Sequence, residues 1–294
     1  MRNTFINELV EAAHKNSNIA LVVGDLGYSV VEPFADQFPD RFLNAGVAEQ
    51  NMTGLAAGMA SEGYHVFTYS IANFPIFRCA EHIRNDIDYH KLPVTVVSVG
   101  GGCAYGALGY SHHAVQDYAF MRSLPNMIIA APGDPMEVRS CIRYLISNPG
   151  PSYLRLGKSG ELCFHSEPPT ISPGKWLQLR STESSKTILC TGACLQVGAK
   201  WIESKKFEEF GLHSVPLWSM KSKALQKSYL RKFKKVITIE DHLIDGGFAS
   251  WLLEAQSMTN TNRIVEPVAL KAGICGSVGS QQTLNLLGGL YYKN

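Results

Sequence analysis

The chain has 294 residues, a hydrophobic fraction of 45% and a formal net charge of +2. This length favours two domains and a substantial core, and the near-neutral charge gives no reason to expect a nucleic-acid or membrane partner. The sequence contains no run of about 18 apolar residues and no signal-peptide core, so we expect no membrane span and a cytoplasmic protein.

The seven cysteines are scattered along the chain and form no CxxC pair. Neither a disulfide framework nor a zinc site is therefore predicted, and we expect no metal ligands from this pattern. Most of the cysteines are expected to be small buried hydrophobic residues.

The first half of the sequence alternates short apolar strands with helices. The predicted elements are helix 3–14, strand 19–23, a short helix or loop 33–38, strand 42–44, a helix from residue 49, strand 65–69, helix 77–88, strand 94–99, helix 117–122, strand 127–130, helix 134–146 and strand 152–156. Such alternation predicts a parallel sheet that is covered by helices on both faces.

Residues 157–186 interrupt the alternation of strands and helices with three prolines and many polar residues. We therefore predict an inter-domain connection with a short hairpin near Trp176–Leu179. The second half then restarts the alternation, with strands at 187–190, 212–218, 235–240 and 265–268 and helices at 195–203, 223–232, 246–253 and 281–287. The predicted fold class is α/β with two doubly wound domains, residues 1–158 and a smaller unit at 187–294, joined by a linker at 159–186.

One carboxylate, Glu49, stands at the head of a helix built from small and apolar residues, within the stretch NAGVAEQNMTGLAAGMASEG. Small residues let a helix approach its neighbours closely, so we expect this helix to be buried. Glu49 is then either a charge favoured by the helix dipole or a carboxyl group that shares a proton. The spacing alone leaves both interpretations open.

Ligands of open parallel sheets bind beyond the carboxyl ends of the strands, where Asp25, Glu49, the loop 100–113 and Arg155 are expected. Each of Arg2, Asp25, Ser29 and Arg155 is an ordinary surface charge or cap when taken alone. Gathered at one sheet edge, they could hold a phosphate, which arginine binds bidentately.

The loop GGGCAYG follows a strand but lacks the GxGxxG spacing, so a dinucleotide site is not predicted. Beyond it, the adjacent His112 and His113 could bind metal or phosphate, could transfer protons, or could lie exposed ahead of a capped helix. Phe74 and Phe77 are either core residues or one wall of a slot for a flat heterocycle.

In this order, four segments resemble the C-terminal half of a transketolase, and the resemblance covers nearly the whole chain from Arg2 onward. GVAEQNMTGLAAGMASEG resembles the Gly-x-x-Glu-x-x-Met helix of that family, and GYSHHAVQD resembles its Gly-Pro-Thr-His loop. GDLGYS resembles the Asp-Leu-x-x-Ser segment, and IEDHLIDGGFAS resembles the Glu-(Glu/Asp)-His-x-x-x-Gly-Gly signature. The Gly-Asp-Gly motif that holds the cofactor's diphosphate in full-length members does not occur in this sequence.

The chain therefore resembles the smaller subunit of a split transketolase, with a pyrimidine-binding domain at 1–158 and a transketolase C-terminal-like domain at 187–294. The resemblance implies dependence on thiamine diphosphate, with Mg²⁺ bound mainly by a partner that carries the N-terminal half, in an α2β2 heterotetramer. It implies transfer of a two-carbon ketol unit between a ketose phosphate and an aldose.

The resemblance also implies residue roles. Glu49 matches the catalytic glutamate that hydrogen-bonds the aminopyrimidine ring, a task that requires a shared proton, which burial favours. The other matches are Phe74 and Phe77 for the pyrimidine wall, His112 for catalysis and substrate contact, His113, Arg2, Ser29 and Arg155 for the substrate and its phosphate end, and Asp25 for a position near the subunit contact.

One departure concerns the donor sugar. The family usually has an acid before Gly-Pro-Thr-His that contacts donor hydroxyls, and here Leu108 takes that position while Tyr110 replaces the proline. An aliphatic side chain accepts no hydrogen bond, so we predict a non-standard donor such as a deoxy or amino sugar. The alternatives are a 1-deoxyxylulose-5-phosphate synthase-like or 2-oxoacid dehydrogenase β-like subunit and, from another class, a non-catalytic structural subunit.

Overall fold

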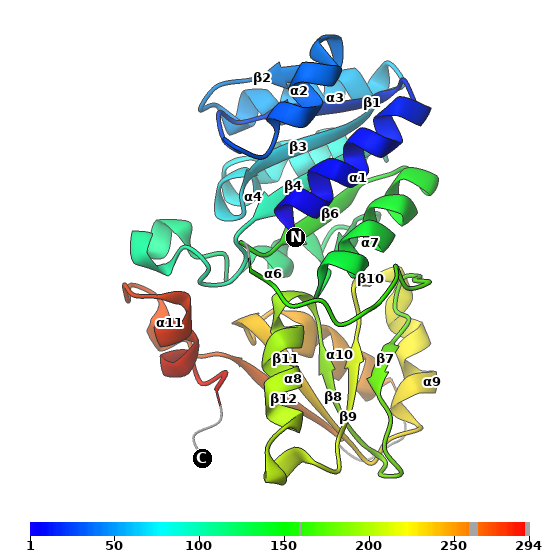
Figure 1. Ribbon diagram of the computed structural model, residues 1–294, viewed down its shortest axis with the longest axis vertical. Helices are drawn as coiled ribbons and strands as arrows, with labels where there is room; N and C mark the ends of the chain where they lie inside the picture. Colours follow the sequence, from blue (N-terminus) through cyan, green and yellow to red (C-terminus); the bar gives the residue numbers. More distant parts are fainter. Residues whose placement is uncertain (159, 259–263, 292–294) are drawn as a thin grey trace.

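A computed structural model describes residues 1–158, 160–258 and 264–291. Among them, the strands form a seven-stranded sheet, in the order β10-β5-β6-β4-β3-β1-β2, and a five-stranded sheet, in the order β12-β11-β8-β9-β7. The two sheets lie one above the other in Figure 1, and their helices flank them.

The first sheet is built from the first half of the chain and one later strand. Its elements are α1 (Arg2–Lys15), β1 (Ile19–Val23), α2 (Glu32–Gln37), η1 (Pro39–Arg41), β2 (Phe42–Asn44), α3 (Glu49–Ser61), β3 (His65–Ile71), α4 (Asn73–Arg78), α5 (Ala80–His82), the π-helix η2 (Ile83–Asp88), β4 (Val94–Val99), η3 (Gly106–Leu108), η4 (Tyr110–His112), α6 (Asp117–Met121), β5 (Ile128–Ala130), α7 (Pro135–Ser147), β6 (Ser152–Leu156) and β10 (Leu217–Ser219). All neighbouring pairs run parallel except β10 with β5.

Burial explains this arrangement. β1 reads IALVV and is buried along its whole length, as expected for a parallel strand covered on both faces. One core cluster joins the sheet to α1, α2 and α7, and another joins it to α3, the 73–88 region and α6. The predicted doubly wound first domain is therefore confirmed.

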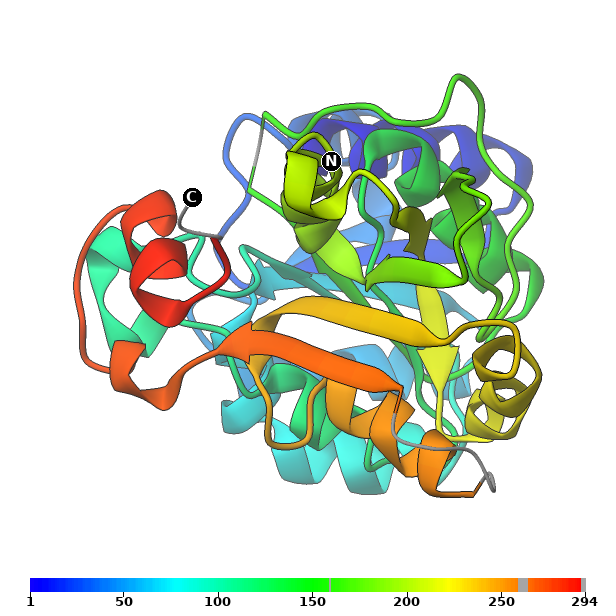
Figure 2. The ribbon, with the colours of Figure 1, turned by 90° about the horizontal axis from the view of Figure 1, so that it is seen from below.

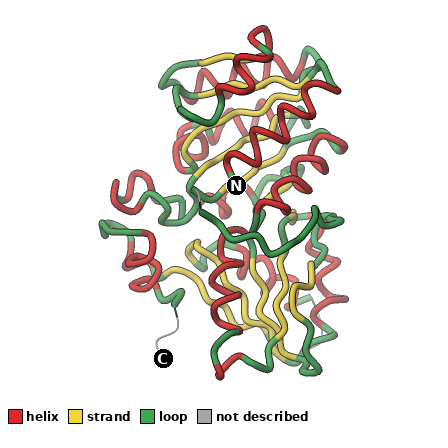
Figure 3. The backbone as a smooth tube through the Cα atoms, in the orientation of Figure 1, coloured by secondary structure: helices red, strands yellow, loops and turns green. Residues whose placement is uncertain are grey.

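The second sheet is built from the second half. Its elements are β7 (Leu177–Arg180), β8 (Lys186–Cys190), η5 (Gly192–Cys194), α8 (Leu195–Ile202), η6 (Lys205–Phe207), β9 (Gly211–Ser214), η7 (Lys221–Leu225), α9 (Gln226–Leu230), β11 (Lys235–Leu243), α10 (Phe248–Ser257), β12 (Val265–Leu270), η8 (Ala272–Ile274) and α11 (Gln281–Gly288). Its strands run parallel except for β7, which pairs antiparallel with β9. Figure 3 shows helices on both faces of these strands, so the second α/β domain is also confirmed.

Three sequence predictions differ from the structure. The hairpin near Trp176–Leu179 is wrong, because β7 is a single edge strand that pairs with β9 more than thirty residues later. The strand predicted at 212–218 is two strands in different sheets, separated at Pro216, whose ring fixes φ and whose nitrogen donates no hydrogen bond. The helix predicted at 77–88 begins earlier, at Asn73, because Pro75 is tolerated in a first helical turn, and it is broken at Cys79.

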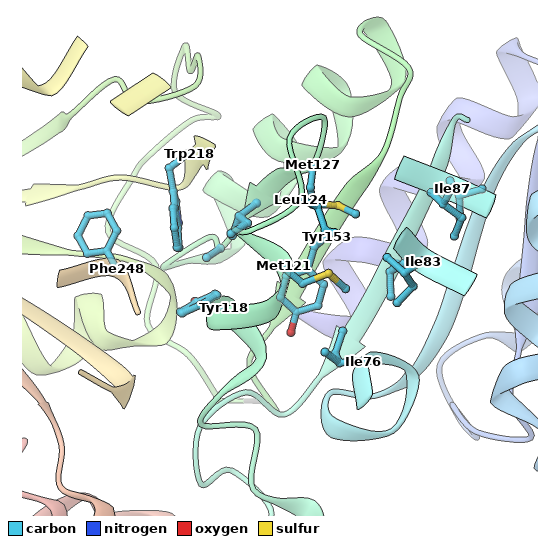
Figure 4. Packing of buried hydrophobic residues seen from close by; sticks show 14 of the residues in the cluster. Ile76, Ile83, Ile87, Tyr118, Met121, Leu124, Met127, Tyr153, Trp218 and Phe248 are labelled. Atoms are coloured by element: carbon cyan, nitrogen blue, oxygen red, sulfur yellow. The ribbon is translucent and has the colours of Figure 1, made fainter. Parts of the chain in front are cut away.

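The two domains share one core at their junction. The cluster that begins under α3 continues through Tyr118 of α6 to Trp218 of β10 and Phe248 of α10 (Figure 4). The Tyr118 and Trp218 rings have centroids 5.2 Å apart, and the Trp218 and Phe248 rings 5.4 Å apart. Burial of three large aromatic side chains fixes the domains relative to each other.

Figure 2 shows a second contact between the halves, where the loop after β4 lies beside α11. The backbone N–H of Gly279 donates to the carbonyl of Gly106 at 3.2 Å, and a Cβ on Gly106 would come within 2.5 Å of Leu284. The glycine-rich loop therefore lets backbone approach the second domain closely. Within the described residues, no helix has both the length and the apolar character that a bilayer crossing requires.

Candidate active site

Glu49 is the first residue of α3, and its side chain is buried although it carries a carboxylate. It follows β2 at the edge of the first sheet, and the residue is 5% exposed. Its Oε2 atom lies 3.6 Å from Nε of Arg78, whose side chain is 63% exposed. Sequence reasoning missed Arg78, because this pair joins residues of two helices that are 29 positions apart.

The expectation that α3 is buried holds for one face only. Met52, Ala56 and Ala60 face the core, whereas Gly54, Leu55 and Gly58 line an open groove of about 700 Å³. A Cβ at Gly54 or Gly58 would meet no atom within 4 Å. The small residues therefore leave a bare helix face beside the glutamate rather than closing a packed interface within this chain.

Phe74 and His112 lie together close to this helix. Their ring centroids are 5.0 Å apart in an edge-on arrangement, and the Asn73 side chain donates to the Ser111 carbonyl at 2.9 Å, which ties α4 to η4. The Ser111 hydroxyl lies 3.0 Å from Nδ1 of His112. Since α4 also carries Arg78, the structure brings Glu49, Phe74 and His112 to neighbouring elements.

Phe77 and His113 differ in exposure. The Phe77 side chain is 50% exposed, so one side of its ring is available to another molecule. His113 is buried at 1% exposure, and burial lowers the pKa of its imidazole, which favours the neutral form. A substrate contact by His113 therefore requires a rearrangement of the loop 106–113, whereas His112 needs none.

The loop after β1 carries two predicted site residues in unusual backbone conformations. Asp25 has φ of +54° and Ser29 has φ of +62°, both in the left-handed region that side chains disfavour. The Asn44 amide donates to the Asp25 carboxylate at 2.9 Å and accepts from the Asp25 N–H at 3.1 Å. The fold thus holds Asp25 and Ser29 in a fixed, strained loop, as functional sites often do.

Arg2 interacts with Tyr69, which packs against this loop. Burial raises the pKa of Tyr69 to about 12, and Arg2 is close enough to offset part of that rise. A Cβ on Gly27 of the strained loop would lie 2.9 Å from the Tyr69 ring, so loop, tyrosine and Arg2 are neighbours. The Nε atom of Arg2 is buried and has no hydrogen-bond partner among the described residues. Such a donor is suited to an anionic ligand.

Arg155, unlike Arg2, has no unpaired guanidinium nitrogen that could bind a ligand. Its Nε donates to Asp117 at 2.7 Å, one terminal nitrogen donates to Asp241 at 2.5 Å, and the other donates to the Ala114 carbonyl at 2.8 Å. The side chain is 3% exposed, and Asp117 also accepts from the Tyr153 hydroxyl. Every nitrogen of the guanidinium group already donates a hydrogen bond. The predicted phosphate contact of Arg155 stays a prediction, and it would require one of these hydrogen bonds to break.

The segment IEDHLIDGGFAS has a structural explanation. Glu240 accepts hydrogen bonds from the N–H groups of Phe248 and Ala249 and so caps α10, and burial raises its pKa to about 8. Asp241 pairs with Arg155 across the domain junction, and the His242 ring stacks on Tyr118 with centroids 5.2 Å apart. These residues hold the domains together and lie apart from Glu49.

The cluster around Glu49 fits the aminopyrimidine part of thiamine. A buried carboxyl group can hydrogen-bond a ring nitrogen, and half-exposed Phe77 offers an aromatic face beside it. The diphosphate part needs a metal ion, and the described residues contain no group of three His, Cys, Asp or Glu side chains placed to hold one.

The chain is similar to known proteins over most of its length. Residues 1–160 match the family described as "Transketolase, pyrimidine binding domain". A protein of Methanocaldococcus jannaschii described as a transketolase C-terminal section is 34% identical over 267 residues, which are 90% of this chain and 84% of the relative. One of the subunits of the apulose-4-phosphate transketolase of Phocaeicola vulgatus is 29% identical over 266 residues, with 87% and 83% coverage.

Among solved structures, one described as "Split gene transketolase, inactive beta4 tetramer" superposes with a TM-score of 0.85 at 30% identity and covers 99% of this chain and 93% of its own. A more distant relative, 1-deoxy-D-xylulose-5-phosphate synthase of Clostridium perfringens, is 28% identical, and the chain spans 41% of its length.

Proposed function

Because this chain belongs to the transketolase family as the smaller subunit of a split enzyme, we propose that Glu49 is the acid through which it activates thiamine diphosphate. The chain is a subunit of a transketolase-type transferase that moves two-carbon ketol units. The observation that carries the residue assignment is a carboxylate only 5% exposed, at the head of a helix beside an open groove.

Bound thiamine diphosphate supplies a nucleophilic carbon and an electron sink for cleavage of a carbon–carbon bond. Glu49 would hydrogen-bond the pyrimidine ring of the cofactor, and its burial would keep water from competing for that contact. Phe74 and Phe77 bound the slot for the ring. Arg78, which is exposed and lies 3.6 Å from Glu49, would have to leave this contact when the ring binds.

The substrate lies between the two groups of residues already described. His112 hydrogen-bonds a substrate hydroxyl near the reacting carbon, while Arg2 and Ser29 bind the phosphate end. The unpaired Nε of Arg2 supports this assignment. Asp25, held by Asn44, positions the Ser29 loop close to the subunit contact. His113 and Arg155 remain proposed substrate contacts, the first after loop movement and the second after exchange of a carboxylate.

We propose a non-standard donor sugar. Leu108 is 58% exposed, so it presents an aliphatic surface where an acid would accept hydroxyl hydrogen bonds. A relative carries the name of an apulose-4-phosphate enzyme, which supports an unusual ketose in this branch of the family.

The test is a donor panel on the assembled enzyme, with xylulose 5-phosphate, deoxy and amino ketose phosphates, and pyruvate. We expect kcat/KM for xylulose 5-phosphate to rise by about tenfold in Leu108→Asp, because one hydrogen bond to a charged acceptor is regained. Wild-type turnover of xylulose 5-phosphate that already equals its best donor would contradict the non-standard donor. Turnover of pyruvate would instead favour the 1-deoxyxylulose-5-phosphate synthase-like alternative.

The open groove on α3 supports a partner in trans. We propose that a subunit with the N-terminal half of a transketolase covers this face in an α2β2 heterotetramer and brings the diphosphate and Mg²⁺ anchors. The bare helix face at Gly54 and Gly58 has room for another chain's backbone. The related β4 tetramer is described as inactive, as expected if β chains alone lack half of the cofactor site.

Gly54→Phe is expected to abolish assembly with the partner while leaving the isolated chain folded. Apart from the helix's own backbone, no atom lies within 4 Å of a Cβ there, and phenylalanine has a higher helix propensity than glycine, so the isolated chain should keep its stability. Light scattering after size-exclusion chromatography measures assembly, and thermal unfolding measures stability.

The matched control is Gly150→Phe, since Gly150 also has no neighbour within 4 Å of its Cβ and lies in the turn before β6. It should assemble normally. Normal assembly of Gly54→Phe would show that the partner does not cover this groove.

A further inference from the structure

A buried acidic cluster lies where the first domain, the second domain and the connection between them meet. Asp134 is the N-cap of α7 and Glu137 is in its first turn, and both residues are fully buried. The start of α7 adjoins the second domain, because a Cβ on Gly133 would lie 2.6 Å from Leu195 of α8. The connection forms the third side of the cluster through His165. The proposed transfer reaction gives none of these residues a role.

Asp134 fastens the connection to α7 through one carboxylate oxygen. Its Oδ2 atom accepts hydrogen bonds from the backbone N–H groups of Phe164 and His165, at 2.7 and 2.9 Å, and lies 3.0 Å from Nδ1 of the His165 ring. Its Oδ1 atom accepts from the backbone N–H of Glu137 at 2.7 Å and so caps α7. The attachment of residues 164 and 165 therefore depends on this single carboxylate.

A second attachment of the connection to α7 contains no titratable group. The Ser140 hydroxyl donates to the carbonyl of Pro169 at 2.7 Å. Because this hydrogen bond is insensitive to pH, a change of protonation at Asp134 or His165 acts only on the part of the connection around residue 165.

The cluster contains more acid than base. Among the described residues, the one basic group within 4.0 Å of either carboxylate is the His165 ring, whose side chain is 16% exposed and can exchange a proton with water. The other titratable groups close to Glu137 are the thiols of Cys141 and Cys190. Burial raises the pKa of both thiols, so they stay neutral near physiological pH.

Glu137 is the least well paired member of the cluster. Its Oε2 atom accepts from the backbone N–H of Gly133 at 2.6 Å, but its Oε1 atom is buried and has no hydrogen-bond partner in the described part of the chain. Burial raises the pKa of Glu137 to about 7, although the Gly133 N–H and the nearby Ser214 hydroxyl oppose the rise. A carboxyl group with one unpaired buried oxygen is better suited to the neutral form than to the charged form.

The protonation of the cluster changes near neutral pH. Hydrogen bonding to Asp134 raises the pKa of His165 above its ordinary 6.5, although burial opposes the rise. Burial alone would raise the pKa of Asp134, but hydrogen bonds from the His165 ring and three backbone N–H groups lower it, so Asp134 stays ionised. The stability that Glu137 and His165 contribute is complete below their ordinary values of 4.5 and 6.5. It is lost as the pH rises through about 7 for Glu137 and through the raised pKa of His165.

From this arrangement we propose that Asp134, Glu137 and His165 form a pH-sensitive latch between α7 and the inter-domain connection. When the latch is protonated, the His165 cation faces the Asp134 carboxylate, Glu137 is neutral, and the backbone of residues 164 and 165 is held. Loss of both protons leaves two neighbouring buried carboxylates without a cation, and water must enter to solvate them. Residues 163–166 then separate from α7, while the Ser140 hydrogen bond keeps the rest of the connection in place.

The test measures backbone hydrogen exchange of the full chain alone by mass spectrometry, at about pH 6 and about pH 8.5, with labelling times scaled for the intrinsic pH dependence of exchange. We expect the protection factor of the peptide that contains Phe164 and His165 to fall at least about tenfold between the two conditions, since one pKa unit corresponds to a factor of ten. Strand β4 should keep its protection and serves as the internal reference.

Two variants separate the titrating groups from general packing. Glu137→Gln keeps the shape and the acceptor for Gly133 but is neutral at every pH, so it should recover most of the protection lost at about pH 8.5. His165→Gln cannot take up a proton, so its protection should already be reduced at about pH 6. The matched controls are Glu183→Gln and His90→Gln, both at exposed positions, and they should behave as wild type does.

Two results would overturn the proposal. One is equal protection of the peptide around residue 165 at both pH values in the wild-type chain. The other is an undiminished loss of protection in Glu137→Gln, because the charge on that residue would then have no part in the release. The protection of β4 identifies a variant that fails to fold, and the nearly isosteric Glu137→Gln decides the question if His165→Gln does. Since the experiment needs neither partner nor cofactor, its failure leaves the proposed transfer function standing.

Discussion

Glu49→Gln is expected to lower kcat of the assembled enzyme by about 10²–10⁴-fold, the usual contribution of a positioned acid or base. Glutamine has nearly the same shape and fits the same buried position at the start of α3, but its amide does not ionise and so cannot exchange a proton as a carboxyl group does. The ring nitrogen that Glu49 faces would therefore lose its proton partner while the slot formed by Phe74 and Phe77 stays intact. KM for the donor should change little, because the substitution leaves the phosphate contacts in place.

The measurement is steady-state turnover of the purified complex, together with the mass of the complex in solution. Glu203→Gln, at an exposed position that follows α8, controls for loss of one negative charge. If Glu49→Gln assembles normally and keeps full activity, the chain is a non-catalytic structural subunit, which is the alternative from another class.

Arg155→Met is expected to lower the free energy of unfolding of the isolated chain by about 3–5 kcal/mol. Methionine fills much of the space of the arginine stem but leaves the carboxylates of Asp117 and Asp241 buried without their cation. Both residues are at most 2% exposed, so neither carboxylate can turn to water. The loss should also loosen the two domains, since Asp117 belongs to α6 and Asp241 to β11.

Urea unfolding of the isolated chain measures this effect, and Arg231→Met, at an exposed position just after α9, is the matched control. A restored stability in the triple variant Arg155→Met/Asp117→Asn/Asp241→Asn would support the ion-pair explanation. If instead Arg155→Met keeps wild-type stability and only raises KM for the donor, then Arg155 grips a substrate phosphate, as the resemblance to transketolases implies.

Much of the fold follows from hydrophobic patterning. Runs such as IALVV at Ile19–Val23 and VTVVSV at Val94–Val99 are continuous enough to indicate parallel strands buried on both faces, and both are strands with those bounds. Patterning does not say which sheet a strand joins. The hydrophobic pattern of residues 212–218 predicts one strand, but Pro216 separates two strands that belong to different sheets. The packing of Trp218 against Tyr118 explains why the second of these strands, β10, joins the first sheet.

For the candidate site, the sequence predicted which residues to consider but not how they pair. The order of the motifs predicted that Glu49 and His112 are site residues. In the structure they lie on α3 and η4, two elements that both contact α4. The motif order gave no sign of Arg78 beside Glu49, because a contact between two helices leaves no periodic signal. It also gave no sign that Arg155 is enclosed, since its partners lie 38 and 86 positions away from it in the chain. Side chains that pair across elements are invisible to local sequence reasoning, and those pairs decide which cations are free to bind a ligand.

The placement of β10 bears on how the polypeptide is synthesised. The last strand from the first half, β6, ends at Leu156, and the strand that completes its sheet starts at Leu217. At a translation rate of roughly 5–20 residues per second, the ribosome needs several seconds to deliver that missing piece. Throughout this interval β5 offers unpaired backbone that a neighbouring nascent chain could pair with. A translational pause within residues 157–216 would therefore prolong the exposure of this edge.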